Sequence, residues 1–318
     1  MPAEHWPELP VAAAKQTYQT VHRYLQIVGK IKLAKAPMLN HWWQVPLYLT
    51  SRGLTTSAVP DRGETFDIDL DFIDHSLQIQ TSRGERKSLK LEPRPVAEFY
   101  RDLMSALHDL GIEVQISDVP CEIPDDVTPF SQDTHHAAYD PEVMHRFWRA
   151  LMKTTQVFAE FRASFTGKCS PVHFFWGSFD LAVTRFCGRR APERAEEDAV
   201  TREAYCEEVS SVGFWPGSEE TGGPAYYAYH VPPPPGYRDA RVRPAAAYFD
   251  GTLKEFLLPY EAVRTATSPR EALLEFCQST YEAGAQLSGW ERPYLERPLI
   301  RPNAARPGSV QAEQPNRS

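Results

Sequence analysis

The segment Phe66–Phe72 (FDIDLDF) alternates apolar and acidic side chains without a break. Because successive side chains of a β-strand point to opposite faces, this pattern predicts a strand with one buried face and one solvated face. The buried face of such a strand needs helices to cover it, which favours an α+β fold. The apolar positions are Phe66, Ile68, Leu70 and Phe72, and the acidic positions are Asp67, Asp69 and Asp71.

Helices are predicted before and after this strand. The first begins at Pro10, ends before Pro37, and has a buried stripe that includes Tyr18 and Leu25 at helical spacing. Asp140-Pro141 is a strong helix start, and Ser268 begins a capping box. The predicted helices cover residues 10–36, 95–110, 140–167 and 268–287.

Two longer segments, 41–52 and 173–186, are predicted to be long strands because apolar residues occupy their alternate positions. Each begins with a histidine followed by two aromatic residues, at His41 and His173. Shorter strands are predicted at 77–81, near Leu89 and at 112–116. Each half of the chain then contains a helix, a long strand, further strands with a hairpin, and a helix. We therefore expect two pseudo-repeated halves, each an antiparallel sheet with helices packed on one face.

The expected boundaries follow from composition. The first half covers residues 1–117, and a segment rich in Pro and Asp, 118–139, connects it to a second half at 140–291. Residues 188–224, which contain a charged run, are expected to be an insertion in the second half. Within it, the aromatic segment 209–217 is expected to be a lid or a buried plug. The tail 292–318 is rich in Pro, Arg, Asn and Gln and is expected to be disordered.

Charge and cysteine content limit the class of protein. A net charge of −8 and a pI near 5.7 argue against a nucleic-acid binder or a protein that binds anionic membranes. The sequence has no signal-peptide pattern at its start and no run near the roughly 20 apolar residues that span a bilayer. Its five cysteines are widely spaced, which favours reduced thiols and a cytoplasmic location. The oligomeric state is left open.

The common catalytic signatures are missing from the sequence. It contains no dinucleotide-binding glycine motif, no Walker loop, no Gly-x-Ser-x-Gly elbow and no His-Glu-x-x-His. A Rossmann dehydrogenase, a P-loop NTPase and an α/β-hydrolase are therefore not expected.

Candidate site residues lie on the polar sides of the two long strands. If these sides face each other, they enclose a cleft between the halves, which is a common place for binding sites. A carboxylate in such a cleft can act as a general base or a metal ligand. The alternative is a solvated sheet face without a role, although aromatic residues favour a pocket. The candidates are Tyr48 and Arg52 in the first half, and Trp176, Ser178 and Asp180 in the second.

Several histidines, and the acidic row formed by Asp67, Asp69 and Asp71, could bind a divalent metal, so a metal cofactor is left open. His136 in the connection and His173 are the histidine candidates, whereas His75 fits a hairpin turn. In an unbroken strand His173 and Asp180 would point to opposite faces, unless a bulge at Gly177 changes the register. Successive carboxylates of the acidic row are about 6.6 Å apart, a spacing that suits a hard cation or simply a solvated strand.

Two further arginines, Arg185 and Arg189, can form an anion-binding corner beside Gly188. The alternative is a solvated basic loop that pairs with the acidic residues of the charged run that follows it in the sequence.

Several long phrases of the sequence resemble a family catalogued as a domain of unknown function, DUF5996. The resemblance covers residues 6–290 and implies one family unit along the whole length rather than two separable modules. It carries no activity, cofactor or catalytic residue. The phrases are LNHWWQVPLY at 39–48, DFIDH at 71–75, SPVHFFWGSFDLAVTRF at 170–186, GRRAP at 188–192 and VSSVGFWPG at 209–217.

Together these features predict an enzyme that acts on a small, anionic molecule by acid/base or metal-assisted chemistry. Asp180, His173 or His136 would supply the acid, base or metal ligand. The guanidinium groups of Arg52, Arg185 and Arg189 would hold the anion, while Tyr48 and Trp176 pack against the substrate. The alternative is a non-catalytic protein that binds a small molecule or a partner in the same cleft. Titratable groups with shifted pKa values in the cleft favour the enzyme.

Overall fold

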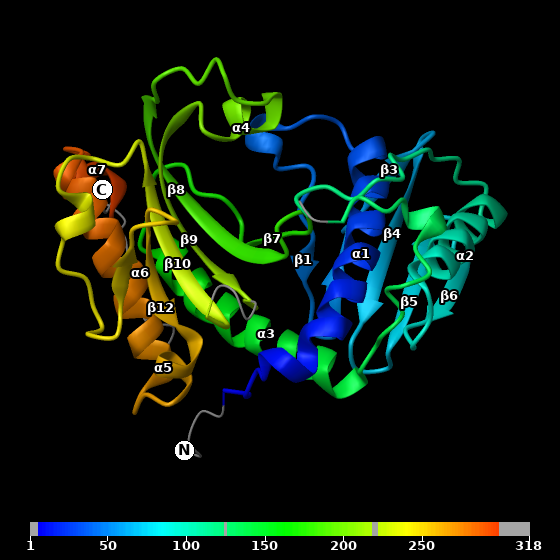
Figure 1. Cartoon of the computed structure of the whole chain (residues 1–318). Helices are drawn as coiled ribbons and strands as arrows, with labels where there is room; N and C mark the ends of the chain where they lie inside the picture. The colour runs from blue at the N-terminus through cyan, green and yellow to red at the C-terminus, as the bar shows by residue number, and fades with distance from the viewer. Residues whose placement is uncertain (1–5, 124–125, 218–221, 299–318) are drawn as a thin grey trace, which may run out of the picture.

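Two antiparallel sheets form the frame of the protein (Figure 1). The structure is a computed structural model that describes residues 6–123, 126–217 and 222–298. The first sheet has the order β1 (Tyr48–Leu49), β2 (Gly53–Thr55), β4 (Glu64–Asp71), β5 (Ser76–Thr81) and β6 (Arg86–Lys90), with β3 (Val59–Asp61) also paired to β4. The second has the order β11 (Tyr248–Asp250), β12 (Glu255–Pro259), β10 (Ala225–Val231), β9 (Glu207–Trp215), β8 (Asp180–Arg190) and β7 (His173–Phe175).

The two sheets meet at their edges. Just before β1, Leu47 exchanges two backbone hydrogen bonds of 2.9 Å with Phe174 of β7. The two edge strands lie side by side in the middle of the molecule (Figure 1). Because backbone pairing continues across this junction, the positions of the two halves are linked to each other.

The middle of helix α1 (Val11–Lys35) is buried on nearly all sides, not along one stripe as its sequence suggests. From Thr20 to Lys32 every residue except His22 is buried. The first sheet and α2 (Val96–Asp109) pack against α1, and the connection between the halves covers another side of it. There the Gln26 side chain donates to the backbone carbonyl of Cys121 at 2.7 Å and accepts from its N–H at 2.9 Å.

Gly29 of α1 makes room for the indole of Trp176, whose Nε1 donates to the carbonyl of Val45 at 2.9 Å. A Cβ at position 29 would lie 2.3 Å from three atoms of that indole. Gly29→Ala should therefore lower the free energy of unfolding by about 1–2 kcal/mol, because overpacking outweighs the better helix propensity of alanine. Urea denaturation tests this, with Gly251→Ala as the control because a Cβ there meets nothing within 4 Å. Equal or higher stability of Gly29→Ala would contradict this packing.

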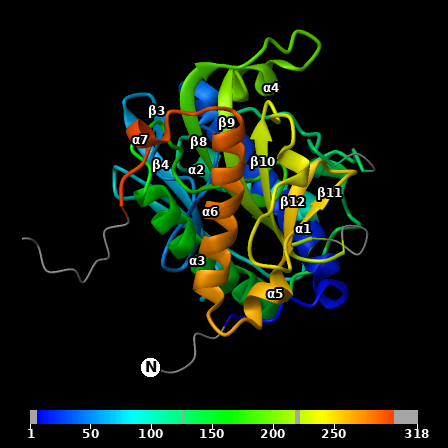
Figure 2. The same ribbon diagram turned by 90° about the vertical axis from the view of Figure 1, so that its left-hand side faces the viewer.

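One face of the second sheet is covered by α3 (Pro141–Ala163), α5 (Tyr260–Arg264) and α6 (Pro269–Leu287); α3 and α6 lie against each other (Figure 2). Side chains of β10 alternate accordingly: Tyr226 reaches Thr154 of α3, and His230 packs on Gly284 of α6. Tyr227 and Tyr229 therefore point to the opposite face, which we call the inner face. At one end of the inner face, α4 (Ala199–Ala204) packs against the 3-10 turn η1 (Asn40–Trp42).

The α+β class and the antiparallel sheets are confirmed. Strands β4, β5 and β6 and all four long helices form where the sequence predicts them. The Asp140 side chain caps α3 by accepting from two backbone N–H groups, and Gly111 follows α2 with a φ of 72°. Short elements complete the fold: η2 (Phe130–Gln132), η3 (Tyr237–Asp239) and α7 (Arg292–Leu295).

Both predicted long strands are broken. In the first predicted strand, 41–52, His41 and Trp42 belong to η1 and have positive φ values of 58° and 60°. Only Tyr48 and Leu49 of this segment form a strand, β1. Segment 173–186 is a hairpin with its turn at 176–179, not a strand with a bulge at Gly177. His41 and His173 therefore do not occupy equivalent positions. Internal duplication of the chain stays a prediction.

Other expectations are corrected in the second half. Residues 188–224 contribute β9, which pairs with β8 and β10 inside the second sheet, and their origin as an insertion relative to the first half stays a prediction. Segment 209–217, expected to be a lid or a buried plug, is largely this strand and mostly buried, and residues 112–116 form no strand. In the tail, α7 forms at Arg292–Leu295 and the N–H of Thr166 donates to the Leu295 carbonyl at 2.8 Å. Residues 299–318 lie outside the described part of the chain.

Candidate functional site

Asp180 is the first residue of β8 and points into the inner face of the second sheet. It is only 4% exposed. One carboxylate oxygen accepts a hydrogen bond from Ser178 Oγ at 2.5 Å, and the other accepts one from the hydroxyl of Tyr227. Asp180 is therefore a buried carboxyl group held by two neutral hydroxyl donors.

The β7–β8 turn positions Asp180. It holds Phe179 at a φ of 58°, which is unusual for a bulky residue, and residues from the first half of the chain and the connection support it. His22 of α1 lies with Nε2 2.8 Å from the Gly177 carbonyl oxygen. The Glu122 carboxyl packs so closely on Gly177 that a Cβ there would lie 2.2 Å from its Oε1. The turn thus brings parts of both halves next to Asp180.

Aromatic rings form the adjoining surface of the inner face. Tyr227 and Tyr229 are stacked with their ring centres 6.0 Å apart, and Trp215 packs 4.5 Å from Tyr227. Gly213 of β9, directly opposite Tyr227, lets that ring lie flat on the sheet. Tyr205, after α4, completes the surface with its hydroxyl 2.9 Å from that of Tyr229. These residues present ring faces and hydroxyls next to the carboxyl of Asp180.

Three carboxyl groups of this region have raised pKa values. Burial raises the pKa of Asp180 to about 6, although its two hydrogen bonds act in the opposite direction. Burial, with the nearby charges of Asp180 and Asp250, raises the pKa of Glu255 to about 7. Burial and the charges of Asp180 and Asp198 also raise the pKa of Glu122. Each group can thus bind or release a proton closer to neutral pH than an ordinary carboxyl.

Glu255 has an unused hydrogen-bonding atom. Its Oε2 is buried and has no hydrogen-bond partner within the described part of the chain. Buried oxygens usually have a partner, so a donor from a ligand or water fits here. We call this group of residues the Asp180 cluster: Asp180, Ser178, Glu122, Tyr205, Tyr227, Tyr229 and Glu255.

Of the predicted site residues, only Ser178 and Asp180 belong to the Asp180 cluster. The hairpin puts His173 on the same sheet face as Asp180, because Phe175 is opposite Asp180 and His173 is opposite Ala182. The sequence argument for opposite faces assumed an unbroken strand and is wrong. Trp176 fills the space beside α1 described above.

His173 and Tyr48 do come together, with ring centres 5.6 Å apart. Burial lowers the pKa of His173 to about 3, so its ring is neutral, and its nitrogens have no partner among the described residues. Lys32 of α1 lies over the Tyr48 ring at 4.8 Å, and burial lowers its pKa to about 8. This second group sits at the junction of the sheets.

The predicted anion-binding arginines are not brought together. Arg52 is exposed and pairs with Asp71 and with Asp74 at 2.6 Å. Arg185 and Arg189 point to the helix side of the second sheet. Arg185 is fully buried among the rings of Phe161, Phe165 and Tyr281, and Arg189 pairs with Glu208 at 2.6 Å.

The remaining candidates have structural partners elsewhere. His136 bonds through Nδ1 to Asp133 at 2.8 Å, and Arg23 of α1 pairs with the same aspartate at 3.2 Å. In the acidic row, Asp71 accepts from Arg52 and from two backbone N–H groups. Among the described residues, metal-type ligands converge instead at His41, Cys206 and Glu207.

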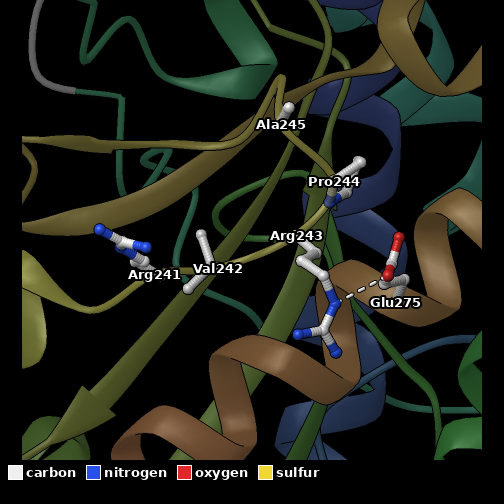
Figure 3. A pocket seen from close by; sticks show the side chains of 6 residues that line it. All are labelled: Arg241, Val242, Arg243, Pro244, Ala245 and Glu275. Atoms are coloured by element: carbon white, nitrogen blue, oxygen red, sulfur yellow. Dashed lines mark hydrogen bonds and ion pairs between the residues drawn. The ribbon is translucent and has the colours of Figure 1, made fainter.

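A surface groove lies away from the Asp180 cluster, with a volume of about 530 Å³. Figure 3 shows it with the ion pair between Arg243 and Glu275, whose atoms are 2.7 Å apart. This groove is shallow and its charged groups are largely paired, so it offers less chemistry than the inner face. Its lining consists of Arg241, Val242, Arg243, Pro244, Ala245 and Glu275.

Sequence reasoning missed most of the Asp180 cluster. Tyr227 and Tyr229 stand two apart in AYYAYHV, a pattern that predicts a strand with one tyrosine face. Glu255 alternates with Leu257 at the start of EFLLP, but its neighbour across the sheet cannot be read from local pattern. Glu122 lies in the connection, where no periodicity indicates which residues turn inward.

Comparisons with known proteins identify a family but no activity. The sequence model of a family of unknown function (DUF5996) matches residues 6–297. No curated protein and no solved structure matches the chain. Within the described residues, no helix has the length and apolar character required to cross a membrane.

Proposed function

The chain belongs to the DUF5996 family, and we propose that it is an enzyme that acts on a small polar molecule at the Asp180 cluster. Asp180 is the proton-transferring group. The observation that carries the proposal is a carboxyl only 4% exposed and held by two hydroxyl donors, in a position where burial raises its pKa to about 6. A carboxyl with a pKa near the working pH exists in both protonation states and suits general acid/base catalysis.

The substrate is uncharged or cationic rather than anionic. Arg52, Arg185 and Arg189 lie away from the Asp180 cluster, and the charges that raise the pKa values of Glu122 and Glu255 are those of other carboxylates. An anion placed here would be repelled, whereas an N–H or O–H donor would satisfy the unpartnered Oε2 of Glu255. The tyrosine and tryptophan rings would pack against the apolar part of such a molecule.

In this proposal the residues of the Asp180 cluster have different roles. Tyr227 and Ser178 hold the Asp180 carboxyl in one orientation, which is required for directed proton transfer. Glu255 would orient the substrate through a donor group. Glu122 and the turn at Gly177 close the side of the cluster next to α1.

A second candidate function is binding of an organic cation without catalysis. Ring faces next to carboxylates attract ammonium groups, and the stacked Tyr227 and Tyr229 with Trp215 and Glu255 have this character. In that case the raised pKa values fall when the cation binds, because a positive charge favours the ionised carboxylates.

Ligand screening tests the proposed function. Thermal shifts would be measured with panels of amines, polyols and carboxylates against wild type, Asp180→Asn and the control Asp69→Asn, which changes a carboxylate of the other sheet. We expect amines or polyols to stabilise wild type and Asp69→Asn but not Asp180→Asn. Stabilisation by carboxylates alone, or an equal response of Asp180→Asn, would contradict the proposal. A ligand recovered unchanged after incubation with wild type would favour the binding function over the enzyme.

We also propose a cytoplasmic location and an origin by internal duplication. The location is supported by five cysteines that are all free thiols, as expected in a reducing compartment. Duplication is supported by the order of elements, in which each sheet follows a long helix and precedes another helix.

A further inference from the structure

Three metal-type ligands from two separate segments of the chain converge at the other end of β8. They are His41 of η1 and the neighbouring Cys206 and Glu207, which follow α4, and their ligand atoms lie within 4.8 Å of one another. The ring of His41 packs 4.6 Å from Phe186 of β8. Phe186 is six residues from Asp180, about 20 Å along an extended strand, so this group is separate from the Asp180 cluster.

The imidazole of His41 is oriented as a ligand. Its Nδ1 lies 3.0 Å from the carbonyl oxygen of Glu203 and 3.3 Å from that of Ala204. Carbonyl oxygens only accept hydrogen bonds, so Nδ1 carries the proton and Nε2 carries the lone pair. The Sγ of Cys206 lies 4.0 Å from Nδ1 of the same ring. Donation from one ring nitrogen to a backbone carbonyl is the arrangement that fixes metal-binding histidines in proteins.

A positive charge already occupies the space between the ligands. Lys168 Nζ donates to His41 Nε2 at 2.9 Å and to Glu207 Oε1, while these two acceptor atoms are 3.7 Å apart. The ammonium group therefore stands where an ion shared by the imidazole and the carboxylate would stand. The Lys168 side chain is 31% exposed, so it can leave this position for solvent.

We propose that His41, Cys206 and Glu207 form a Zn²⁺ site for which the ammonium of Lys168 competes. A nitrogen, a sulfur and a carboxylate oxygen are the donors that zinc prefers, whereas Mg²⁺ and Ca²⁺ prefer oxygen alone. When zinc binds, the Cys206 thiol releases its proton to solvent and the sulfur takes the metal. Lys168 leaves still protonated, and water takes the fourth position.

Titration of the full chain with Zn²⁺, and with Co²⁺ as a spectroscopic probe, tests this site. We expect one equivalent to bind and Co²⁺ to show a thiolate charge-transfer band. Cys206→Ser should abolish the band, whereas the control Cys187→Ser should keep it, because Cys187 lies near Glu208 and not in this group. Lys168→Met should tighten zinc binding about two- to fivefold, since the metal no longer has to displace an ion pair.

If Cys206→Ser fails to fold, Lys168→Met still tests the proposal, because it leaves the three zinc ligands in place. A cobalt spectrum without the thiolate band in both wild type and Lys168→Met would overturn the proposal. So would zinc affinity that is the same in wild type and Cys206→Ser, or that Lys168→Met does not change. These results are independent of Asp180→Asn, which should bind zinc as wild type does.

Discussion

Asp180→Asn should become more stable relative to wild type as the pH rises from 4 to 7, by about 2–3 kcal/mol in the free energy of unfolding. In the folded protein burial raises the pKa of Asp180 to about 6, above the ordinary aspartate value of 3.8. Wild type must therefore ionise a buried carboxyl as the pH passes through this window, which costs stability. Asparagine does not ionise, so the variant avoids that cost.

Urea denaturation at several pH values measures this difference, and subtraction of the wild-type curve removes most other titrating groups. Asp198→Asn is the matched control. Hydrogen bonds from the Thr201 side chain and from backbone N–H groups lower the pKa of Asp198, so its replacement should give a difference of the opposite sign. If the stability of Asp180→Asn relative to wild type stayed constant or fell as the pH rose, the Asp180 carboxyl of wild type would be an ordinary ionised group.

Gly213→Ala should lower the free energy of unfolding by about 2–4 kcal/mol and abolish ligand binding at the Asp180 cluster. A Cβ at position 213 would lie 2.1 Å from Cζ of Tyr227 and 2.2 Å from its hydroxyl oxygen. The tyrosine must move, and its hydrogen bond to Asp180 is lost. The expected loss of stability therefore has two causes, overpacking at position 213 and the loss of a buried hydrogen bond.

Gly251→Ala is the control, since its Cβ meets nothing within 4 Å. It should change stability by no more than about 0.5 kcal/mol and leave the ligand response intact. Both variants would be compared by urea denaturation and by thermal shift with the strongest ligand from the screen. If Gly213→Ala were as stable and as responsive as Gly251→Ala, Tyr227 would not lie on Gly213 and would not hold Asp180.

Sequence patterns predict the parts of this fold that depend on neighbouring residues. The alternation predicted for β4 is present in the structure, because the two-residue period of a strand depends only on its own backbone. Asp140-Pro141 starts α3 because the Asp140 side chain accepts hydrogen bonds from the first turn of the helix. The same reasoning fails where one residue changes direction. At Gly177 a turn replaces a straight strand, which moves His173 to the face of Asp180.

The candidate site depends on contacts between residues that are far apart in sequence. Tyr227 reaches Asp180 across 47 positions because β9 lies between β8 and β10, and strand order has no local signature. Position along β8 also decides the role of Arg185: odd positions there point to the helices and even positions to the inner face. The arginine therefore packs among aromatic rings and cannot hold a ligand beside Asp180.

The most direct test of the proposed function is the pKa of the Asp180 carboxyl in the folded protein. Carbon-13 NMR of labelled aspartate follows it through a pH titration, and Asp180→Asn identifies the signal by its loss. The proposal predicts a midpoint near pH 6. A midpoint at or below the ordinary aspartate value of 3.8 would show an ordinary structural carboxylate and contradict acid/base catalysis by Asp180.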